Sequence, residues 1–161
     1  MADRDFDIVA KEQFSFLQSE FGFNLLRCNK EDWGFELLYT NNTTGVKITY
    51  EYQAAYIFIM VYRLIDGEFC ENPRNINEDT ILNGYGLDDI ISVQNIEALI
   101  KPAYEYGEKS EYYDEDKGLT LYTSAFAKNL KIFGGKVLQG DFAIFLDADK
   151  IVKKRIKDYK H

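Results

Sequence analysis

Histidine is almost absent from this 161-residue sequence, whose single histidine is the last residue, His161. Zinc sites and histidine-based catalytic triads need imidazole side chains, so the sequence argues against both. The two cysteines, Cys28 and Cys70, are too few for a disulfide scaffold and lack the spacing of metal ligands. Gly84-Tyr85-Gly86 and Gly134-Gly135 lack the spacing of phosphate-binding loops, and we interpret both as turns or caps. We therefore expect no metal and no cofactor.

A basic surface and a long apolar run are missing as well. The chain has 19 Lys and Arg residues against 27 Asp and Glu, which gives a formal net charge of −8. Nucleic-acid binders need a basic footprint, so we expect no nucleic acid as a partner. No run approaches the length of a transmembrane helix, and the charged N-terminal stretch MADRDFDIVAKEQ contains no apolar signal-peptide segment. We expect a cytoplasmic protein with reduced thiols and no membrane partner.

Apolar and aromatic residues are plentiful enough to build a core. They make up 46% and 16% of the chain, and the aromatic share includes 12 Tyr and 12 Phe. A chain of this length without a recognisable linker predicts one domain over residues 1–161. We interpret the aromatic residues as the filling of a well-packed sheet rather than as a stacking platform.

The stretch 45–65, GVKITYEYQAAYIFIMVYRLI, predicts the hairpin at the centre of the fold. In its first half, apolar residues alternate with Lys47, Thr49 and Glu51, which places one row of side chains in the core and the other in water. Residues 55–65 are apolar on both faces, a pattern typical of a central strand. We therefore expect helices or a partner subunit over both faces of that strand.

Hydrophobic spacing predicts the other regular elements. Apolar residues three and four positions apart predict helices over about 4–20, 119–133 and 142–159. Short apolar runs at 23–28 and 35–40 predict two strands that precede the hairpin. The predicted fold class is α+β, with an antiparallel sheet of about four or five strands packed by an N-terminal helix and two C-terminal helices.

The middle of the chain is less regular. Residues 66–80 are polar and indicate a surface loop. Asp88-Asp89 suit the start of a short helix, yet Ile90–Val93 fits a helix and a strand equally well. Residues 103–117 form the most polar stretch, either a mobile loop or a helical segment that leads into the next helix.

The segment 103–117, AYEYGEKSEYYDEDK, is the best candidate for a binding surface. It interleaves tyrosines with six carboxylates, and its only cations are Lys109 and Lys117. Tyrosine buries a large area at low entropic cost, and carboxylates steer a basic partner. The candidate partner-binding residues are Tyr104, Tyr106, Glu108, Glu111, Tyr112, Tyr113, Asp114, Glu115 and Asp116. The alternative is a solvated loop whose tyrosines rest on the sheet.

Charge is unevenly divided along the chain. Residues 150–161 hold six of the 19 basic residues and one of the 27 acidic residues, so the first 149 residues carry 13 basic and 26 acidic residues. Cations at the end of a helix suit its dipole. Other partners for this basic end are an acidic surface, anionic lipid, or the acidic segment 103–117 of the same chain.

Carboxylate pairs are the remaining route to catalysis. The candidates are Asp88-Asp89, the run 114–116, and Asp147 with Asp149. A glycosidase needs two carboxylates that converge across a cleft, whereas neighbouring acids on one strand or helix point apart or into water. We therefore assign no catalytic residue.

Two segments resemble a known group of proteins. The first is FSFLQSEFGF followed by the hairpin ITYEYQAAYIFIMVYRL, and the second is LYTSAFAKNLKIFGGKVLQGDFAIFLDADKIVKKRIK. This layout is similar to small, acidic, single-domain bacterial proteins that are mostly uncharacterised, some of which are thought to be immunity proteins of polymorphic toxin systems. The resemblance covers chiefly residues 14–66 and 119–156 and assigns no functional residue. It implies a non-enzymatic binding protein.

These observations together predict a non-enzymatic protein-binding module. Its expected partner is a basic protein, and the resemblance narrows this to an immunity-type inhibitor of a basic toxin or nuclease. One alternative is a small hydrolase that uses paired carboxylates. Another is a structural homo-oligomer, a homodimer for example, that associates through an exposed face of the sheet.

Overall fold

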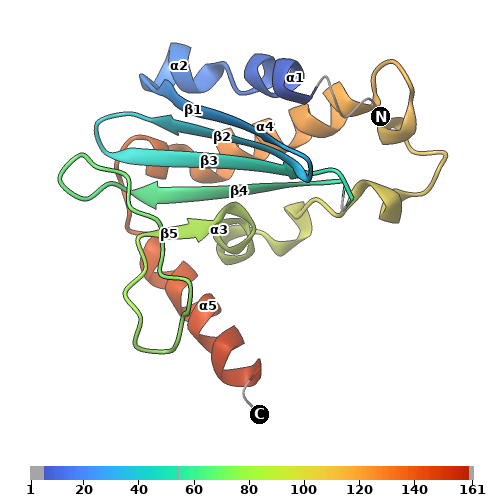
Figure 1. Ribbon diagram of the computed structural model, residues 1–161. Coiled ribbons are helices and arrows are strands. Elements are labelled where there is room, and N and C mark those ends of the chain that lie inside the picture. Colours follow the sequence, from blue (N-terminus) through green and yellow to red (C-terminus); the bar gives the residue numbers. More distant parts are fainter. Residues whose placement is uncertain (1–5, 54, 160–161) are drawn as a thin grey trace.

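The chain folds around a five-stranded antiparallel sheet in which strands adjacent in sequence are adjacent in space (Figure 1). The computed structural model describes residues 6–53 and 55–159. The strands are β1 (Asn24–Glu31), β2 (Gly34–Thr40), β3 (Thr44–Glu51), β4 (Tyr56–Arg63) and β5 (Gly84–Gly86). The helices are α1 (Phe6–Gln13), α2 (Phe16–Phe21), α3 (Leu87–Gln94), α4 (Gly118–Leu138) and α5 (Phe145–Tyr159), with short 3-10 turns η2 (Ile96–Ala98), η3 (Ala103–Tyr106) and η4 (Glu111–Tyr113). The predicted α+β class is confirmed.

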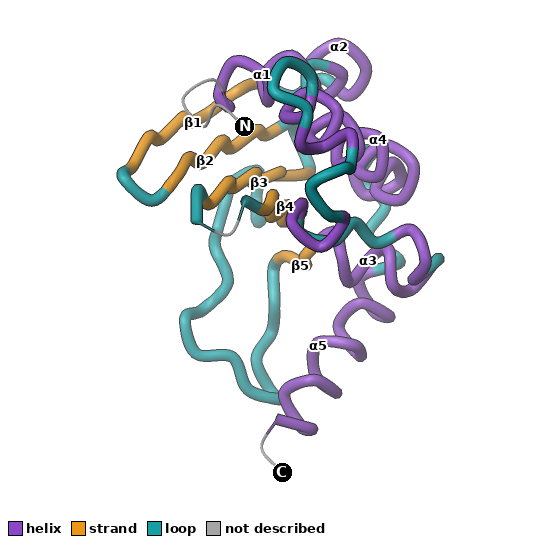
Figure 2. The backbone as a smooth tube through the Cα atoms, turned by 90° about the vertical axis from the view of Figure 1, so that its right-hand side faces the viewer, coloured by secondary structure: helices purple, strands orange, loops and turns teal. Residues whose placement is uncertain are grey.

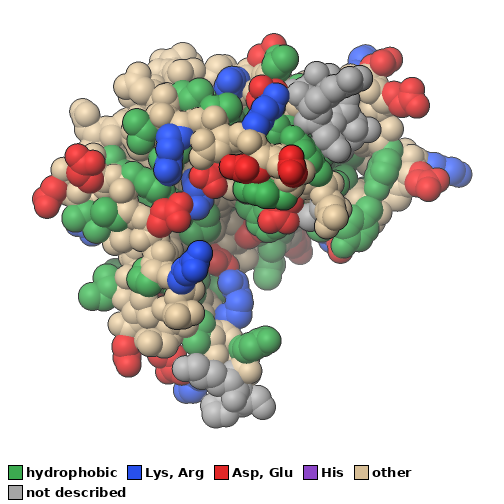
Figure 3. Space-filling model, viewed as in Figure 1, with side chains coloured by type: hydrophobic (Ala, Val, Ile, Leu, Met, Phe, Trp, Pro, Cys, Tyr) green, Lys and Arg blue, Asp and Glu red, His purple; other side chains and the backbone are tan. Residues whose placement is uncertain are grey.

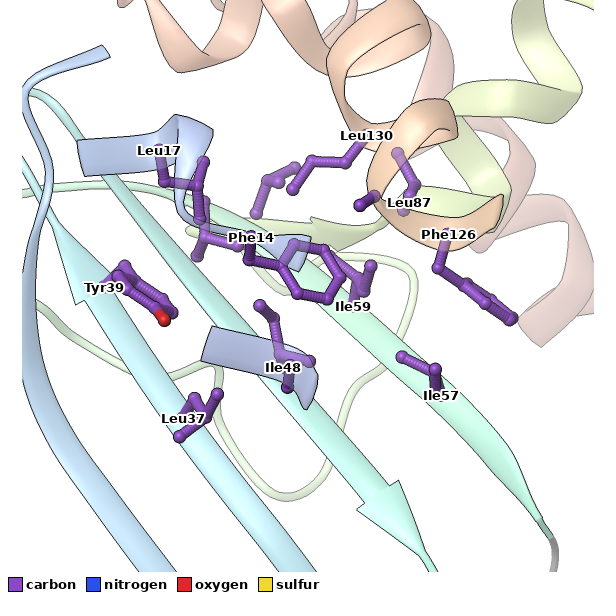
Figure 4. Packing of buried hydrophobic residues seen from close by; sticks show 14 of the residues in the cluster. Phe14, Leu17, Leu37, Tyr39, Ile48, Ile57, Ile59, Leu87, Phe126 and Leu130 are labelled. Atoms are coloured by element: carbon purple, nitrogen blue, oxygen red, sulfur yellow. The ribbon is translucent and has the colours of Figure 1, made fainter. Parts of the chain in front are cut away.

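The three central strands align their apolar residues in rows across the sheet. Leu37 of β2 pairs with Ile48 of β3, which pairs with Ile59 of β4, and all three side chains are buried. Figure 4 shows them facing the helices, with Phe14 and Leu130 packed above. Burying one such side chain stabilises a fold by roughly 1.5–3 kcal/mol. The alternation seen in the sequence therefore selects the face on which the core forms.

The single N-terminal helix that we predicted is two helices, and positions 4 and 5 of its predicted range lie outside the described residues. The chain turns between α1 and α2, where the Leu17 amide donates to the Phe14 carbonyl at 3.0 Å. This bond spans three residues, which tightens the turn relative to an α-helix. Both Phe14 and Leu17 are fully buried on either side of it. Gly22, at φ 70°, ends α2 as predicted.

Helix α4 crosses the face of the sheet that carries Leu37, Ile48 and Ile59, and it is longer than predicted. We expected Gly134-Gly135 to end it, but the helix continues through both glycines. A Cβ at position 134 would lie 3.1 Å from Leu130 and 3.9 Å from Leu87 of α3. Gly134 therefore lies where α4 packs beside α3. The intrinsic cost of a glycine in a helix, about 1 kcal/mol, is outweighed by this tertiary packing.

The helices lie on one side of the sheet, and a loop covers part of the other side (Figure 2). Tyr62 and Leu64 are buried outside the main core, and the Phe69 ring lies 4.8 Å from the Tyr62 ring. Nearer the start of β4, the Phe58 side chain remains 42% exposed. Of the two covers that we expected over both faces of β4, helices are absent from this face among the described residues (Figure 2), and a partner subunit stays a prediction. The segment between β4 and β5 covers one end of that face instead.

Strand β5 corrects the interpretation of Gly84-Tyr85-Gly86 as a turn. These residues pair with Met60–Tyr62 of β4 and form the edge of the sheet. A Cβ on Gly84 would lie 2.3 Å from the Tyr62 ring, so only glycine lets this backbone approach the ring so closely. The adjoining helix α3 settles the open choice at Ile90–Val93 in favour of a helix.

Helix α5 begins later than predicted and extends away from the sheet (Figure 1). Asp141 caps a turn instead of the helix itself, since its Oδ1 accepts a hydrogen bond from the Ala143 amide at 3.1 Å. Two residues of the predicted apolar stripe, Leu146 and Tyr159, are exposed, and Ala148 is fully buried in their place. None of the helices within residues 6–53 and 55–159 is long and apolar enough to span a membrane.

Two glycine substitutions should have opposite effects on stability. Gly84→Ala should lower the free energy of unfolding by about 1–3 kcal/mol, because the new methyl group would overlap the Tyr62 ring. In Gly135→Ala the new methyl group meets open space beside α4, so the free energy of unfolding should rise by up to about 1 kcal/mol. Urea denaturation of both variants measures the two values. Equal effects of the two substitutions would contradict the assignment of β5.

A hydrogen bond from Tyr56 joins β4 to α3. The Tyr56 hydroxyl donates to Asp88 Oδ2 at 2.8 Å and lies 3.1 Å from the Ile100 carbonyl. Burial of the carboxyl raises the pKa of Asp88 above its ordinary value of 3.8, although the hydrogen bond from Tyr56 opposes this shift. The native state therefore binds this proton more tightly than the unfolded chain does.

The raised pKa of Asp88 predicts a pH-dependent contribution to stability. Its contribution should be greatest below pH 3.8 and should decline as pH rises through the raised pKa. Denaturant unfolding gives the free energy of unfolding of the native protein and of Asp88→Asn from about pH 3 to 6, in steps of about half a pH unit. The difference between the two proteins at each pH isolates the contribution of Asp88. The native protein should lose stability relative to Asp88→Asn as pH rises through the raised pKa of Asp88. A gain in stability of the native protein relative to Asp88→Asn with rising pH would contradict the prediction.

Candidate functional site

The predicted binding segment connects α3 to α4 and is folded into two short turns. It begins after Pro102 with η3, reverses at Gly107 (φ 86°), and continues through η4 into the first turn of α4. The Ser110 hydroxyl accepts a hydrogen bond from the Tyr112 amide at 3.2 Å, which caps η4. The segment thus approaches α4 through two 3-10 turns, as in the helical interpretation of the sequence.

Aromatic side chains fix this segment to α4. The Tyr106 and Tyr112 rings lie 5.2 Å apart, and the Tyr112 and Tyr122 rings lie 5.0 Å apart, both edge to face. The Tyr122 hydroxyl donates to the Lys101 carbonyl at 2.7 Å. Burial raises the pKa of both Tyr112 and Tyr122. Tyr112 therefore rests on a helix, whereas our alternative interpretation placed the tyrosines of the segment on the sheet.

Other tyrosines of the segment face solvent. Tyr104 is 62% exposed and Tyr113 is also exposed. The Tyr106 hydroxyl accepts a hydrogen bond from the Lys101 amide at 3.0 Å while its ring remains exposed on one side. In Figure 3, acidic and hydrophobic side chains adjoin along the edge where Figure 1 draws this connection. The segment thus presents aromatic surface from a fixed base.

The carboxylates of the segment are not neutralised within the described chain. None of the ion pairs formed among residues 6–53 and 55–159 includes Glu105, Glu108, Glu111, Asp114, Glu115 or Asp116. Asp114 Oδ2 accepts hydrogen bonds from the Asp116 and Lys117 amides at 3.1 and 2.7 Å. Asp114 therefore helps to start α4, and the other five carboxylates lie exposed around it.

The basic helix α5 does not neutralise this acidic segment. Its Arg155 pairs with Asp89 of α3 at 2.5 Å, and its Lys153 pairs with Asp149 at 3.4 Å. The first ion pair joins α5 to α3, and the second lies within α5. The predicted intramolecular pairing with residues 103–117 is therefore not formed among the described residues, and the acidic surface keeps its charge.

Two of the carboxylates that we considered for catalysis, Asp88 and Asp149, are held by tyrosine hydroxyls. Asp88 is held by Tyr56, as described above. Asp149 accepts a hydrogen bond from the Tyr85 hydroxyl at 2.6 Å and pairs with Lys153. Burial and the neighbouring Asp149 raise the pKa of Tyr85, which keeps its proton in this bond. These contacts fasten α3 and α5 to the sheet.

A cleft that no sequence pattern indicated lies beside α5. The cleft has a volume of about 740 Å³ and is lined by residues from the end of β4, residues 79–85, the turn at 140–146, and α5. These four segments are far apart in the sequence, so no local motif marks the cleft. Within the described residues, no group of three or more His, Cys, Asp and Glu side chains is arranged to hold a metal ion.

Comparisons with family models, with curated proteins and with solved structures found no match to this chain.

Removing the central ring of the aromatic stack should loosen the binding segment. Tyr112→Ala deletes the contacts to both Tyr106 and Tyr122, so amide hydrogen exchange within 103–117 should accelerate about tenfold or more. The matched control is Tyr104→Ala, which removes a tyrosine whose ring is exposed and should leave exchange unchanged. Equal exchange in both variants would mean that the stack does not order the segment.

Proposed function

We propose that this protein is a non-enzymatic binding module that recognises a basic protein through the surface formed by residues 104–116. The observation that carries the proposal is a set of carboxylates that form no ion pair with other described residues, set beside exposed tyrosines on a segment packed against α4. The proposed contact residues are those expected from the sequence. They are Tyr104, Tyr106, Glu108, Glu111, Tyr112, Tyr113, Asp114, Glu115 and Asp116.

The physical chemistry of such a surface suits tight and selective association. Carboxylates on one edge attract a basic partner over a distance of about one Debye length, roughly 8–10 Å at physiological salt, and so increase the association rate. Exposed tyrosines then provide contact area at small entropic cost. Because η3 and η4 are already ordered against α4, little conformational freedom would be lost on binding.

The kind of partner follows from the resemblance together with this surface. A row of carboxylates reproduces the charge of a nucleic-acid backbone, so it complements the phosphate-binding groove of a nuclease. Some of the small acidic bacterial proteins that this sequence resembles are thought to be immunity proteins. We therefore propose an immunity-type inhibitor of a basic toxin or nuclease as the specific form of this binding function.

Neutralising four carboxylates should slow association with the partner. The variant Glu111→Gln, Asp114→Asn, Glu115→Gln and Asp116→Asn keeps the shape of each side chain, and asparagine at 114 keeps the capping oxygen. The association rate at low salt should fall about tenfold or more, and the loss should shrink as salt is added. Surface plasmon resonance with the partner recovered from host lysate measures both effects.

The control variant has the same change in net charge, made at positions outside the proposed surface. Glu12→Gln, Glu31→Gln, Glu78→Gln and Asp158→Asn replace exposed acids outside the proposed surface. If the two quadruple variants slow association equally, net charge alone is responsible and the proposed surface is wrong. If neither variant differs from the native protein, binding does not depend on these carboxylates.

A further inference from the structure

The cleft beside α5 has the size and composition of a small-molecule site. Its volume of about 740 Å³ falls within the range of roughly 300–1,000 Å³ that is usual for ligand sites. The long connection between β4 and β5 runs from the sheet alongside α5 and forms one wall (Figures 1 and 2). The Lys153 ammonium of α5 donates to the Thr80 carbonyl of this connection at 2.5 Å, which holds the two walls in place.

Aromatic rings form the apolar part of the cleft. The Tyr85 and Phe145 rings lie 4.8 Å apart, and the Phe142 and Phe145 rings lie 5.1 Å apart. Ile81 and Leu146 add apolar surface and are 87% and 74% exposed. Such exposure is costly for two aliphatic side chains that line the same hollow, and an apolar ligand body would cover them.

Most charged groups of the cleft already have partners in the protein. Asp149 is held by Tyr85 and Lys153, and Asp141 accepts a hydrogen bond from the Ala143 amide. Lys153 divides its donors between Asp149 and the Thr80 carbonyl. These groups build the walls and offer little binding capacity to a ligand.

Arg63 differs from Lys153, the other cation of the cleft. Its guanidinium lies over the Phe142 ring, 5.6 Å from the centroid, and it belongs to none of the ion pairs formed among the described residues. The stacking leaves the planar fork of donors available to an oxyanion, which Arg binds through two parallel hydrogen bonds. An anionic head group would therefore bind next to the aromatic floor.

The charges of the lining disfavour a ligand with more than one negative charge. Two cations, Arg63 and Lys153, face three acids, Asp79, Asp141 and Asp149. A dianion such as a phosphate monoester would be repelled by this excess of acids, whereas one carboxylate needs only Arg63. The apolar walls call for a ligand with a hydrocarbon or aromatic body.

We infer that the cleft binds an amphipathic monocarboxylate, with its carboxylate on Arg63 and its apolar body against Phe142 and Phe145. This site shares no residue with the surface at 104–116, so either proposal stands without the other. The class includes medium-chain fatty acids and aryl-alkanoic acids.

Isothermal titration with decanoate below its micellar concentration tests the inference on the full chain. Saturable one-to-one binding is expected, and decylammonium, which has the same tail and the opposite charge, should not bind. Arg63→Gln should weaken decanoate binding about tenfold or more, because one charge-assisted contact is lost. The control Arg74→Gln removes an exposed arginine outside the cleft and should change nothing.

A second variant tests the cleft without altering Arg63. Leu146→Glu places a negative charge at the exposed lining and should weaken decanoate binding, whereas Ile132→Glu, at an equally exposed site outside this cleft, should not. Absence of saturable decanoate binding would overturn the inference. So would equal binding of decylammonium, or unchanged affinity in both Arg63→Gln and Leu146→Glu.

Discussion

The apolar register of β2, β3 and β4 is the constraint on which the rest of the structure depends. Leu37, Ile48 and Ile59 align across the three strands, and a slip of one residue would turn every such side chain to the opposite face. Only one face of the sheet carries the full apolar row, so α1, α2, α3 and α4 all pack there (Figures 2 and 4). The connections between strands and helices must then pass around the ends of the sheet, where both proposed binding sites lie.

The two sites use the same structural principle with different chemistry. At one end, the acidic segment is held by a stack of tyrosine rings on α4, which leaves its carboxylates free to act on a partner. At the other, α5 is tied to its neighbours through Asp149 and Arg155, which leaves Arg63 as the free cation among the described residues of the cleft lining. In both places, internal contacts satisfy some polar groups and fix the geometry of those that remain. The uneven charge of the chain thus serves two separate purposes: anchoring α5 and exposing an acidic edge.

Local patterns in the sequence predicted those parts of the fold whose cause is local. The alternation in 45–65 predicted β3 and β4, and the three-and-four spacing predicted α4 and α5. Errors arose where tertiary packing overrides local preference. Gly134 lies within a helix that packs beside α3, and Gly84 pairs with Tyr62 at the sheet edge, where the Tyr62 ring leaves no space for a side chain. Residues 103–117 pack on Tyr122 of the next helix, and the cleft is lined by four separated segments; no local pattern in the sequence marks either arrangement.

The central claim is that the acidic edge recognises a basic protein, and the most direct test is affinity capture from lysate of the native host. The tagged protein is incubated with lysate at low and at moderate salt, and bound proteins are identified and quantified by mass spectrometry. The account predicts one basic protein, recovered near one-to-one at low salt and released as the salt concentration rises. Recovery of an acidic partner, or of a partner whose retention does not change with salt, would contradict it.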